Sequence, residues 1–407
     1  MKKIVRYRHK VILGIIKPFI KAFTKKVYNY TPIKYKLDKK PYLVLANHCM
    51  NLDCFFISQS FNFPIYYVAT DNIFRRNLKS KLLKFAVHPV PKIKGDSDVK
   101  TIKDLQQIVK DGGSVGLFPE GNQTYTGEGI YMSPAIGKLI KFLKLDVIFY
   151  NLEGTYLTLP RWADYRRRGK VVGYIKKLMP YEEYKDLTVE EINEIVKQNI
   201  IVSTVKFQNE NSNLKYVGKN KAEGIQHILY RCPKCKKIAT ITPSGDDFCC
   251  AECGLKGTYT DQAKLLLSEN VYDIDSVLKW DRWQKNYLIE NGLEIKDDED
   301  ILCEDFTLYL IKRAAKNEYG KLGKLHLKKD RFEFVSDDGE VTTFTFDNIR
   351  NISIQFKDLL QFHLKDGRFF EAKSKEVTSM VKYCDLFCYL KAKLTGKKDF
   401  SITDYRN

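Results

Sequence analysis

Residues 42–53 read Tyr-Leu-Val-Leu-Ala-Asn-His-Cys-Met-Asn-Leu-Asp, and this stretch decides how the first half of the chain is interpreted. The short apolar run Tyr42–Ala46 predicts a buried strand. The strand ends at Asn47 and His48, and Asp53 follows. An imidazole at the carboxyl end of a strand lies where open α/β sheets bind ligands, and it can accept a hydroxyl proton near neutral pH. A carboxylate a few residues later can fix its tautomer. Taken alone, a structural histidine is the commoner explanation.

Residues 41 to about 205 alternate short apolar runs with segments of helical spacing. This alternation predicts an α/β layer architecture. The predicted strands are Tyr42–Ala46, Ile65–Ala69, Ser114–Phe118, Asp146–Asn151 and Lys170–Ile175. The predicted helices are Asp53–Ser60, Leu78–Phe85, Ser97–Lys110, Met132–Phe142 and Val189–Ile201.

A second polar turn follows a predicted strand at Phe118-Pro-Glu-Gly121. Gly121 permits a tight turn whose backbone N–H groups can face an anion, and Glu120 places a carboxylate at the same edge. A purely structural turn, with no catalytic or binding role, can have the same Pro-Glu-Gly sequence. This motif alone therefore leaves its function open.

Taken together, Asn47-His48-x4-Asp53 and Phe118-Pro-Glu-Gly121 resemble the glycerolipid acyltransferase superfamily, which includes the 1-acylglycerol-3-phosphate acyltransferases. The resemblance covers roughly residues 30–210, about half the chain. It implies an acyltransferase-type α/β sandwich and direct transfer of an acyl chain from a thioester to a lipid-precursor hydroxyl, without an acyl-enzyme. It also implies that His48 and Asp53 are catalytic, as general base and orienting partner. Glu120 and Gly121 would position the acceptor.

Several positions depart from the family's pattern. The arginine that usually lies between the two blocks is missing, and Lys92 is the nearest cation, able to bind phosphate only as a point charge. After Gly121 the family commonly has Thr-Arg-Ser, whereas this chain has Asn122-Gln123-Thr124, so a second arginine is missing. The strand 146–151 also lacks the usual proline. The residues assigned to substrate binding are Asn47, Lys92, Glu120, Gly121 and Asn122. The arginines that could replace the missing phosphate contacts, or form only an exposed basic loop, are Arg161, Arg166, Arg167 and Arg168.

Cys49 and Cys54 flank the histidine motif and raise the alternative of a thiol nucleophile. A cysteine beside its histidine in sequence seldom reaches the ring well, and small buried residues give the same pattern. We therefore expect catalysis without a covalent intermediate.

Two Cys-x2-Cys pairs, Cys232/Cys235 and Cys250/Cys253, predict one zinc ion in a zinc ribbon at residues 226–260. Four thiolate ligands close a tetrahedral site, so this zinc would be structural. Cys249 is an extra neighbour and is not assigned as a ligand. No organic cofactor is expected beyond the acyl-thioester donor.

The last hundred residues change character. A helical stretch at Asp261–Asn291 lies in an expected helical linker, 261–300, and short alternating strands then predict a small β-barrel with a closing helix at Val377–Leu394. This order, over residues 301–398, resembles pleckstrin-homology-like domains, which often bind phosphoinositides or proteins. A packing or dimerisation module remains an equal alternative.

The chain is basic, with 69 Lys and Arg against 50 Asp and Glu and a net charge of +19. Such a charge favours anionic partners. Residues 1–40 are expected to form a basic segment that lies at the membrane interface, because they contain no acid before Asp38. The acyltransferase domain is expected to follow at residues 41–215. The apolar positions with helical spacing there are Ile12, Ile16, Phe19, Ile20, Phe23 and Val27. A helix packed on the protein's own core is the alternative. The sequence contains no apolar run of 18 residues, so a helix that spans a membrane is not expected.

These features predict a peripheral membrane O-acyltransferase of phospholipid synthesis, cytoplasmic and bound to the inner face of the membrane. The expected partners are anionic membrane lipids, a lysophospholipid acceptor, and acyl-CoA or acyl-carrier protein as donor. Two alternatives stay open: a nucleic-acid-binding zinc-ribbon protein, and a catalytically silent lipid-binding scaffold. Nucleic acid is not expected as a partner, because the first alternative leaves the His48 and Glu120 motifs unexplained.

Overall fold

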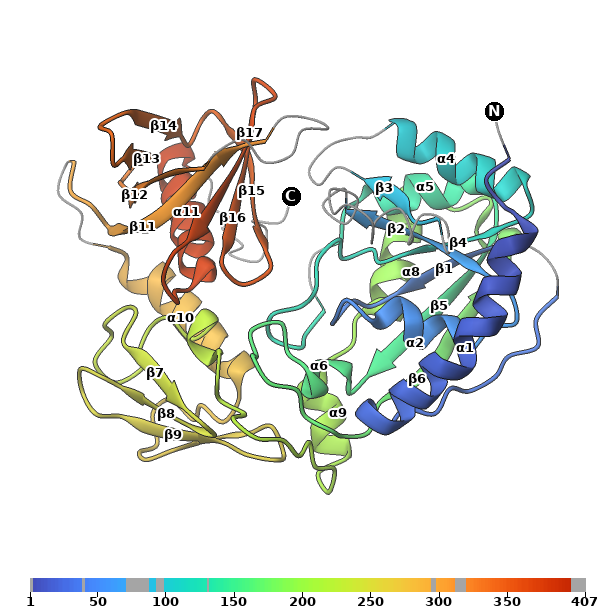
Figure 1. Cartoon of the computed structure of the whole chain (residues 1–407), viewed down its shortest axis with the longest axis horizontal. Helices are drawn as coiled ribbons and strands as arrows, with labels where there is room; N and C mark the ends of the chain where they lie inside the picture. Colours follow the sequence, from blue (N-terminus) through green and yellow to red (C-terminus); the bar gives the residue numbers. More distant parts are fainter. Residues whose placement is uncertain are drawn as a thin grey trace. The chain divides into compact units, whose positions relative to one another are not determined.

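The chain folds into two compact units in a computed structural model (Figure 1). Unit 1 comprises Met1–Pro160 and Arg166–Gly218, and unit 2 comprises Arg161–Tyr165 and Lys219–Asn407. The structure describes residues 3–38, 41–70, 88–92, 99–129, 132–293, 298–311 and 320–396. None of the helices in these ranges is long and apolar enough to cross a membrane.

Unit 1 is built on a six-stranded sheet with the order β3-β2-β4-β1-β5-β6. Its strands are β1 (Tyr42–Ala46), β2 (Ile65–Thr70), β3 (Val90–Lys92), β4 (Ser114–Leu117), β5 (Asp146–Glu153) and β6 (Val172–Met179). All neighbours pair in parallel except β5 and β6, which are antiparallel. The α/β class predicted from the alternating pattern is therefore confirmed.

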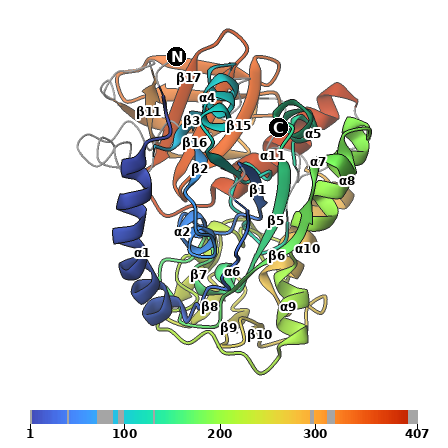
Figure 2. The same cartoon turned by 90° about the vertical axis from the view of Figure 1, so that its right-hand side faces the viewer.

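Helices cover both faces of this sheet (Figure 2). Leu43 and Leu45 of β1 belong to a core cluster shared with α4, α5 and α8, whereas Val44 and Ala46 belong to a second cluster shared with α1 and α2. Strand β1 is thus buried on both faces, which explains its unbroken apolar run. The helices of unit 1 are α1 (Tyr7–Tyr28), α2 (Asp53–Ser58), α4 (Val99–Lys110), α5 (Ala135–Leu143), α6 (Thr155–Thr158), α7 (Tyr181–Tyr184), α8 (Val189–Ile200) and α9 (Thr204–Glu210).

Most boundaries in unit 1 lie within a few residues of those predicted. Strand β6 begins at Val172 rather than Lys170, and α5 begins at Ala135 rather than Met132. The predicted helix Leu78–Phe85 lies outside the described residues. The short strand β3 was not predicted, because its three residues, Val-Pro-Lys, carry no alternation.

Unit 2 contains a small antiparallel sheet with the order β10-β9-β8-β7. Its elements are the 3-10 turn η2 (Ile225–His227), β7 (Ile241–Ser244), β8 (Asp247–Cys250), β9 (Lys256–Tyr259) and β10 (Leu265–Leu267), followed by α10 (Val277–Asn291). The helical stretch predicted from Asp261 is thus wrong in its first half. Leu265–Leu267 pairs with β9 instead, because a short apolar run satisfies its backbone groups equally well in a sheet.

The rest of unit 2 is a seven-stranded antiparallel sheet, order β14-β13-β12-β11-β17-β16-β15, followed by α11 (Met380–Thr395). The strands are β11 (Leu302–Leu310), β12 (Lys321–Leu327), β13 (Arg331–Ser336), β14 (Val341–Thr345), β15 (Ile349–Gln355), β16 (Leu359–Leu364) and β17 (Phe369–Ser374). Phe387 of α11 packs edge-on against Phe346, in the turn that follows β14. The strands and the closing helix match the predicted order, whereas closure into a barrel and the pleckstrin-homology likeness stay predictions.

Candidate active site

His48 and Asp53 lie at the two ends of the short loop between β1 and α2. Asp53, the first residue of α2, is fully buried, and its Oδ2 lies 2.8 Å from His48 Nδ1. The same oxygen accepts hydrogen bonds from the backbone N–H groups of Cys49 (2.7 Å) and Met50 (2.9 Å). The loop therefore wraps around one carboxylate oxygen, and the sequence spacing is what brings these three donors to it.

This arrangement assigns the histidine tautomer. An ionised carboxylate only accepts hydrogen bonds, so His48 Nδ1 must carry the proton that it shares with Asp53. The lone pair then resides on Nε2, the nitrogen that can take a proton from a hydroxyl. The His48 side chain is 19% exposed, so the ring is held firmly without being sealed from a ligand.

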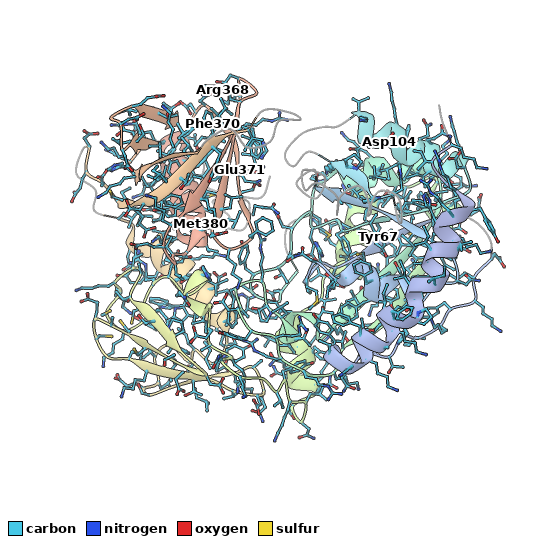
Figure 3. All side chains as sticks on the ribbon, in the orientation of Figure 1. Tyr67, Asp104, Arg368, Phe370, Glu371 and Met380 are labelled. Carbon is cyan, nitrogen blue, oxygen red and sulfur yellow. The ribbon has the colours of Figure 1, made fainter. Side chains whose placement is uncertain are left out.

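Aromatic stacking fixes the plane of the imidazole. The ring of Phe118 lies against His48 with ring centroids 4.1 Å apart and planes inclined by 15°. Phe118 stacks in turn on Tyr67 of β2, labelled in Figure 3, at 5.7 Å. The role of Phe118 beside His48 could not be predicted, because a contact between residues seventy positions apart in the chain leaves no local signal.

The Pro-Glu-Gly turn lies beside the histidine loop. Strands β1 and β4 are parallel neighbours, so the loops that follow them leave the same edge of the sheet. The Gly121 N–H donates to the Phe118 carbonyl (3.0 Å) with Gly121 at a φ of +65°, which favours glycine. The Thr124 N–H donates to the His48 carbonyl (3.0 Å), which joins the two loops directly. Glu120 is 5% exposed.

The other residues assigned to substrate binding have different surroundings. Asn47 is buried and its amide exchanges two hydrogen bonds with the backbone of Leu152, at 2.9 and 2.8 Å, which clamps β1 to β5. Asn122 is half-buried next to Gly121. Lys92 is exposed at the carboxyl end of β3, the same edge as His48, but three strands away, a distance of about 14–15 Å.

Three of the arginines considered as replacements have structural contacts. Arg167 is fully buried, and Arg168 Nε donates to the Lys26 carbonyl (3.0 Å). The guanidinium of Arg166 lies over the ring of Tyr28, 5.2 Å from its centroid. The contacts of Arg166 and Arg168 tie this loop to the end of α1, and both side chains are exposed.

A narrow pocket adjoins the two loops. Its lining includes Asn47, Cys49 and Glu120 from the loops and Thr155 and Tyr156 from α6. The contribution of α6 was not predicted, because this single helical turn carries no motif. The pocket lies beside the residues that flank His48, and His48 itself is not among its lining residues.

The two cysteines of the motif are poor nucleophiles. Burial raises the pKa of the Cys49 thiol well above its usual range and that of Cys54 to about 12, and the Asp53 carboxylate adds to both increases. A protonated thiol at these positions does not attack a thioester at neutral pH. The geometry therefore favours His48 acting on a substrate hydroxyl.

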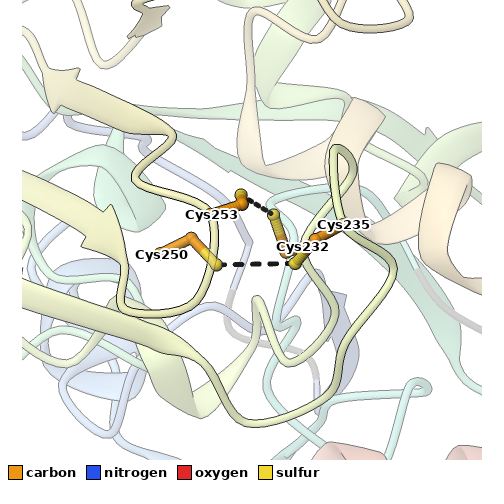
Figure 4. Close-up of side chains that lie close together, drawn as sticks. All are labelled: Cys232, Cys235, Cys250 and Cys253. Atoms are coloured by element: carbon orange, nitrogen blue, oxygen red, sulfur yellow. Dashed lines mark hydrogen bonds between the residues drawn. The ribbon is translucent and has the colours of Figure 1, made fainter.

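The four cysteines of unit 2 come together in one cluster (Figure 4). Their sulfur atoms all lie within 4.8 Å of one another, with Cys232–Cys253 and Cys235–Cys250 separations of 3.7 Å. A tetrahedral zinc site with Zn–S bonds of about 2.3 Å requires S–S separations of about 3.8 Å. The two 3.7 Å separations match this value, so the four thiols are placed to hold a zinc ion, and Cys249 is not part of the cluster.

The backbone around the cluster forms two matching turns. The Lys236 N–H donates to the Cys232 carbonyl and the Gly254 N–H donates to the Cys250 carbonyl, both at 3.0 Å. Lys236 and Gly254 both have a positive φ, of 67° and 72°. The two knuckles therefore have nearly the same conformation, although only one of them has a glycine at this position.

The lysines next to the cluster are engaged within unit 2. Lys234 pairs with Glu269, Lys237 pairs with Glu252, and Lys236 Nζ lies 4.3 Å from the ring centroid of Tyr272. Nucleic-acid-binding modules use such lysines for phosphate contacts. These pairings weaken the nucleic-acid alternative.

Three comparisons relate the chain to known proteins. The acyltransferase family model matches residues 25–150, less than half of the chain. The 1-acyl-sn-glycerophosphate acyltransferase PlsC from Thermotoga maritima is 16% identical over 50% of this chain and 81% of its own, with a TM-score of 0.41. The RAN binding domain of NUP2 from Ashbya gossypii is 15% identical over 26% of this chain and 100% of its own, with a TM-score of 0.17. A comparison with curated proteins gave no match. The family match thus assigns an acyltransferase domain to residues 25–150, which contain both the His48 and the Glu120 loops.

Proposed function

We propose that unit 1 is an O-acyltransferase that moves a fatty acyl chain from acyl-CoA or acyl-carrier protein to the hydroxyl of a lysophosphatidate-like acceptor. The observation that carries this proposal is the His48–Asp53 pair, which leaves a lone pair on Nε2 of a partly exposed ring inside the segment matched by the acyltransferase model.

The reaction uses the residues in simple roles. His48 Nε2 takes the proton from the acceptor hydroxyl while its oxygen attacks the thioester carbonyl carbon. The C–S bond then breaks, and the imidazolium returns the proton to the departing thiolate, which gives an ester and a free thiol. Asp53 keeps Nδ1 protonated and stabilises the imidazolium through the 2.8 Å contact.

Acceptor binding is proposed for the Glu120 turn and for Lys92. Glu120 and the turn at Gly121–Asn122 lie next to His48, where they can position the hydroxyl. Lys92, at the same edge of the sheet, would meet an anionic headgroup farther away as a point charge. Asn47 supports the site by holding β1 against β5.

We also propose that α1 seats unit 1 on an anionic membrane, on the inner leaflet in the cell. Six large apolar side chains of this helix are exposed, most of them four residues apart: Tyr7, Val11, Ile15, Ile16, Phe19 and Phe23. The exposed cations Lys10, Lys21, Lys25 and Lys26 accompany them. Apolar and cationic side chains together match the interface of an anionic bilayer.

Lys17 is an exception among these cations. Its Nζ donates to the Phe61 carbonyl (2.5 Å), and burial, followed by the charge of Lys34, lowers the pKa of Lys17 to about 8. This lysine anchors α1 to its own unit rather than to lipid. The packed-helix alternative and the membrane proposal therefore describe different sides of the same helix.

The catalytic proposal is tested with the full-length protein, labelled acyl donors and anionic vesicles. Lysophosphatidate, glycerol-3-phosphate and uncharged lysolipids are offered as acceptors to the wild type and to Lys92→Gln. We expect ester formation with the anionic acceptors and a higher KM for them in the variant. Vesicle binding without turnover on any donor and acceptor would instead support a lipid-binding scaffold.

We further propose that Cys232, Cys235, Cys250 and Cys253 hold one structural zinc ion. The sulfur separations carry this proposal, because they match the spacing of four thiolates around a tetrahedral zinc ion. Replacing Cys250 with serine should remove about one equivalent of zinc and lower the Tm, since metal binding contributes to folding. The matched control is Cys249→Ser, which should keep the zinc. Equal zinc content in both variants would contradict the proposal.

A further inference from the structure

A second cluster of metal-binding side chains lies on the seven-stranded sheet of unit 2, apart from the four-cysteine cluster. Cys303 of β11 and His326 of β12 are direct cross-strand partners, and Asp300 lies just before β11. One ligand atom from each of these residues lies within 4.8 Å of the others. The sequence analysis did not identify this group, because its members are joined by strand register and not by a local motif.

The outer face of the sheet carries this cluster. Leu325 and Leu327, on either side of His326, are fully buried, so the alternating side chain of His326 lies on the opposite face of β12. Cys303 is exposed beside it. Neither side chain is needed to fill the core, and both are accessible to a ligand.

The hydrogen bonding orients the histidine toward the thiol. Asp300 Oδ2 lies 2.8 Å from His326 Nδ1, so the ring donates from Nδ1 and keeps its lone pair on Nε2. His326 Nε2 lies 4.0 Å from Cys303 Sγ. Carboxylates orient most zinc-binding histidines in this way.

The distances fit a metal bridging the two strands. With Zn–N of about 2.0–2.1 Å and Zn–S of about 2.3 Å, a tetrahedral ion requires an N–S separation of about 3.6 Å. The observed 4.0 Å is a few tenths of an ångström longer.

Three carboxylates lie close to Cys303 in the chain, those of Asp300, Glu304 and Asp305. An oxygen of Asp300 lies within 4.8 Å of the ligand atoms of both Cys303 and His326. Glu304 itself is engaged by Lys382 and Tyr383, which leaves Asp300 as the carboxylate of the cluster.

We propose that Asp300, Cys303 and His326 form a second metal site, for zinc or a similar thiophilic divalent ion. Cys303 Sγ and His326 Nε2 are the ligands, and Asp300 orients His326. Two protein ligands leave positions for water or for a group from another molecule. This proposal is independent of the acyltransferase proposal and of the four-cysteine site.

Zinc titration of the full-length protein by calorimetry tests the site. The protein is first equilibrated so that tighter sites are filled, and the wild type is compared with Cys303→Ser and His326→Gln. We expect one additional equivalent in the wild type that both variants lose. Asp300→Asn should weaken this binding by about 10–100-fold, the effect typical of a residue that orients a metal ligand.

Asp305→Asn is the matched control. Like Asp300→Asn, it removes one negative charge near Cys303, but Asp305 is on β11 and the partner of His326 is Asp300. Its affinity should stay within about threefold of the wild type. Equal weakening in Asp300→Asn and Asp305→Asn, or equal binding of Mg²⁺, would reveal a diffuse acidic patch and overturn the proposal.

Alkylation of Cys303 with iodoacetamide, followed by mass spectrometry, gives a second readout. Zinc should protect Cys303 in the wild type and not in His326→Gln. If metal-free Cys303 reacts faster than an ordinary thiol and zinc gives no protection, the cluster is a reactive thiol, and the metal proposal fails.

Discussion

The two units each contain a histidine whose Nδ1 lies 2.8 Å from an aspartate Oδ2: His48–Asp53 in unit 1 and His326–Asp300 in unit 2. The two contacts have the same length, and their surroundings differ. Asp53 is fully buried and takes two backbone N–H bonds as well, whereas the Asp300 side chain is 37% exposed. A His–Asp pair alone therefore does not define a function.

The neighbour of Nε2 separates the two sites. Next to the His48 ring lie an aromatic stack from Phe118 and the turn that carries Glu120, which suits a proton acceptor facing a substrate. Next to His326 Nε2 lies the thiol of Cys303, which suits a metal. We therefore propose two different chemistries for the same orienting device.

The largest expected effect comes from exchanging the aspartates for asparagine. Asp53→Asn should lower kcat for acyl transfer by about 10²–10⁴-fold, because the imidazolium loses its countercharge. Asp300→Asn should leave kcat within about twofold. Steady-state kinetics on both variants measure the difference, and similar losses in the two would erase the distinction between the sites.

Lowering the membrane affinity of α1 should affect acyl transfer at the unit 1 site and not metal binding in unit 2. Phe19, 73% exposed, is replaced with serine, and affinity for anionic vesicles should fall about tenfold as its apolar contact with the membrane is lost. Turnover of membrane-bound acceptor should fall with it, while zinc binding at His326 stays unchanged. Vesicle sedimentation measures the affinity. Phe142→Ser on α5, where the ring is 48% exposed, is the control and should bind like the wild type.

The aromatic stack on His48 should contribute a smaller amount. Phe118→Leu removes a ring contact worth about 0.5–1.5 kcal/mol, so kcat/KM should fall by about two- to tenfold. His363 and Phe369 in unit 2 stack in the same way, with centroids 4.3 Å apart. Phe369→Leu should therefore leave acyl transfer unchanged. A larger loss in Phe369→Leu than in Phe118→Leu would contradict the role given to the stack.

His9 provides the smallest effect, and it shows what burial does to a histidine without a carboxylate partner. Burial, followed by the charges of Arg8, His88 and Arg6, lowers the pKa of His9 from 6.5 to about 4. The unfolded chain therefore binds this proton more tightly, and stability is lost as pH falls from about 6.5 toward 4. Urea unfolding across this range should show a shallower pH dependence in His9→Gln. If the free energy of unfolding depends on pH equally in His9→Gln and in the wild type, protonation of His9 is not the cause of the acid destabilisation.

Much of the unit 1 site could be predicted from sequence, because its residues stand next to strand ends. His48 follows β1 and Glu120 follows β4, and parallel strands bring both to one edge. The clamp between Asn47 and Leu152 and the Phe118 stack could not be predicted. They depend on side-chain contacts between distant segments that no spacing encodes.

Unit 2 shows the same limit. The four-cysteine cluster follows from two local Cys-x2-Cys pairs. The pairing of Cys303 with His326 depends on the register of β11 against β12, and a shift by one residue would send one side chain to the other face. The strand at Leu265–Leu267 was predicted as helix for a related reason, since a short apolar run fits both.

The most direct test of the central claim is acyl transfer by His48→Ala, measured beside the wild type with a labelled thioester donor in anionic vesicles. Circular dichroism, zinc content and vesicle binding establish that the variant is folded and bound. The account predicts that turnover falls by at least about 10²-fold while these three properties are kept. Turnover at the wild-type rate in His48→Ala would contradict it.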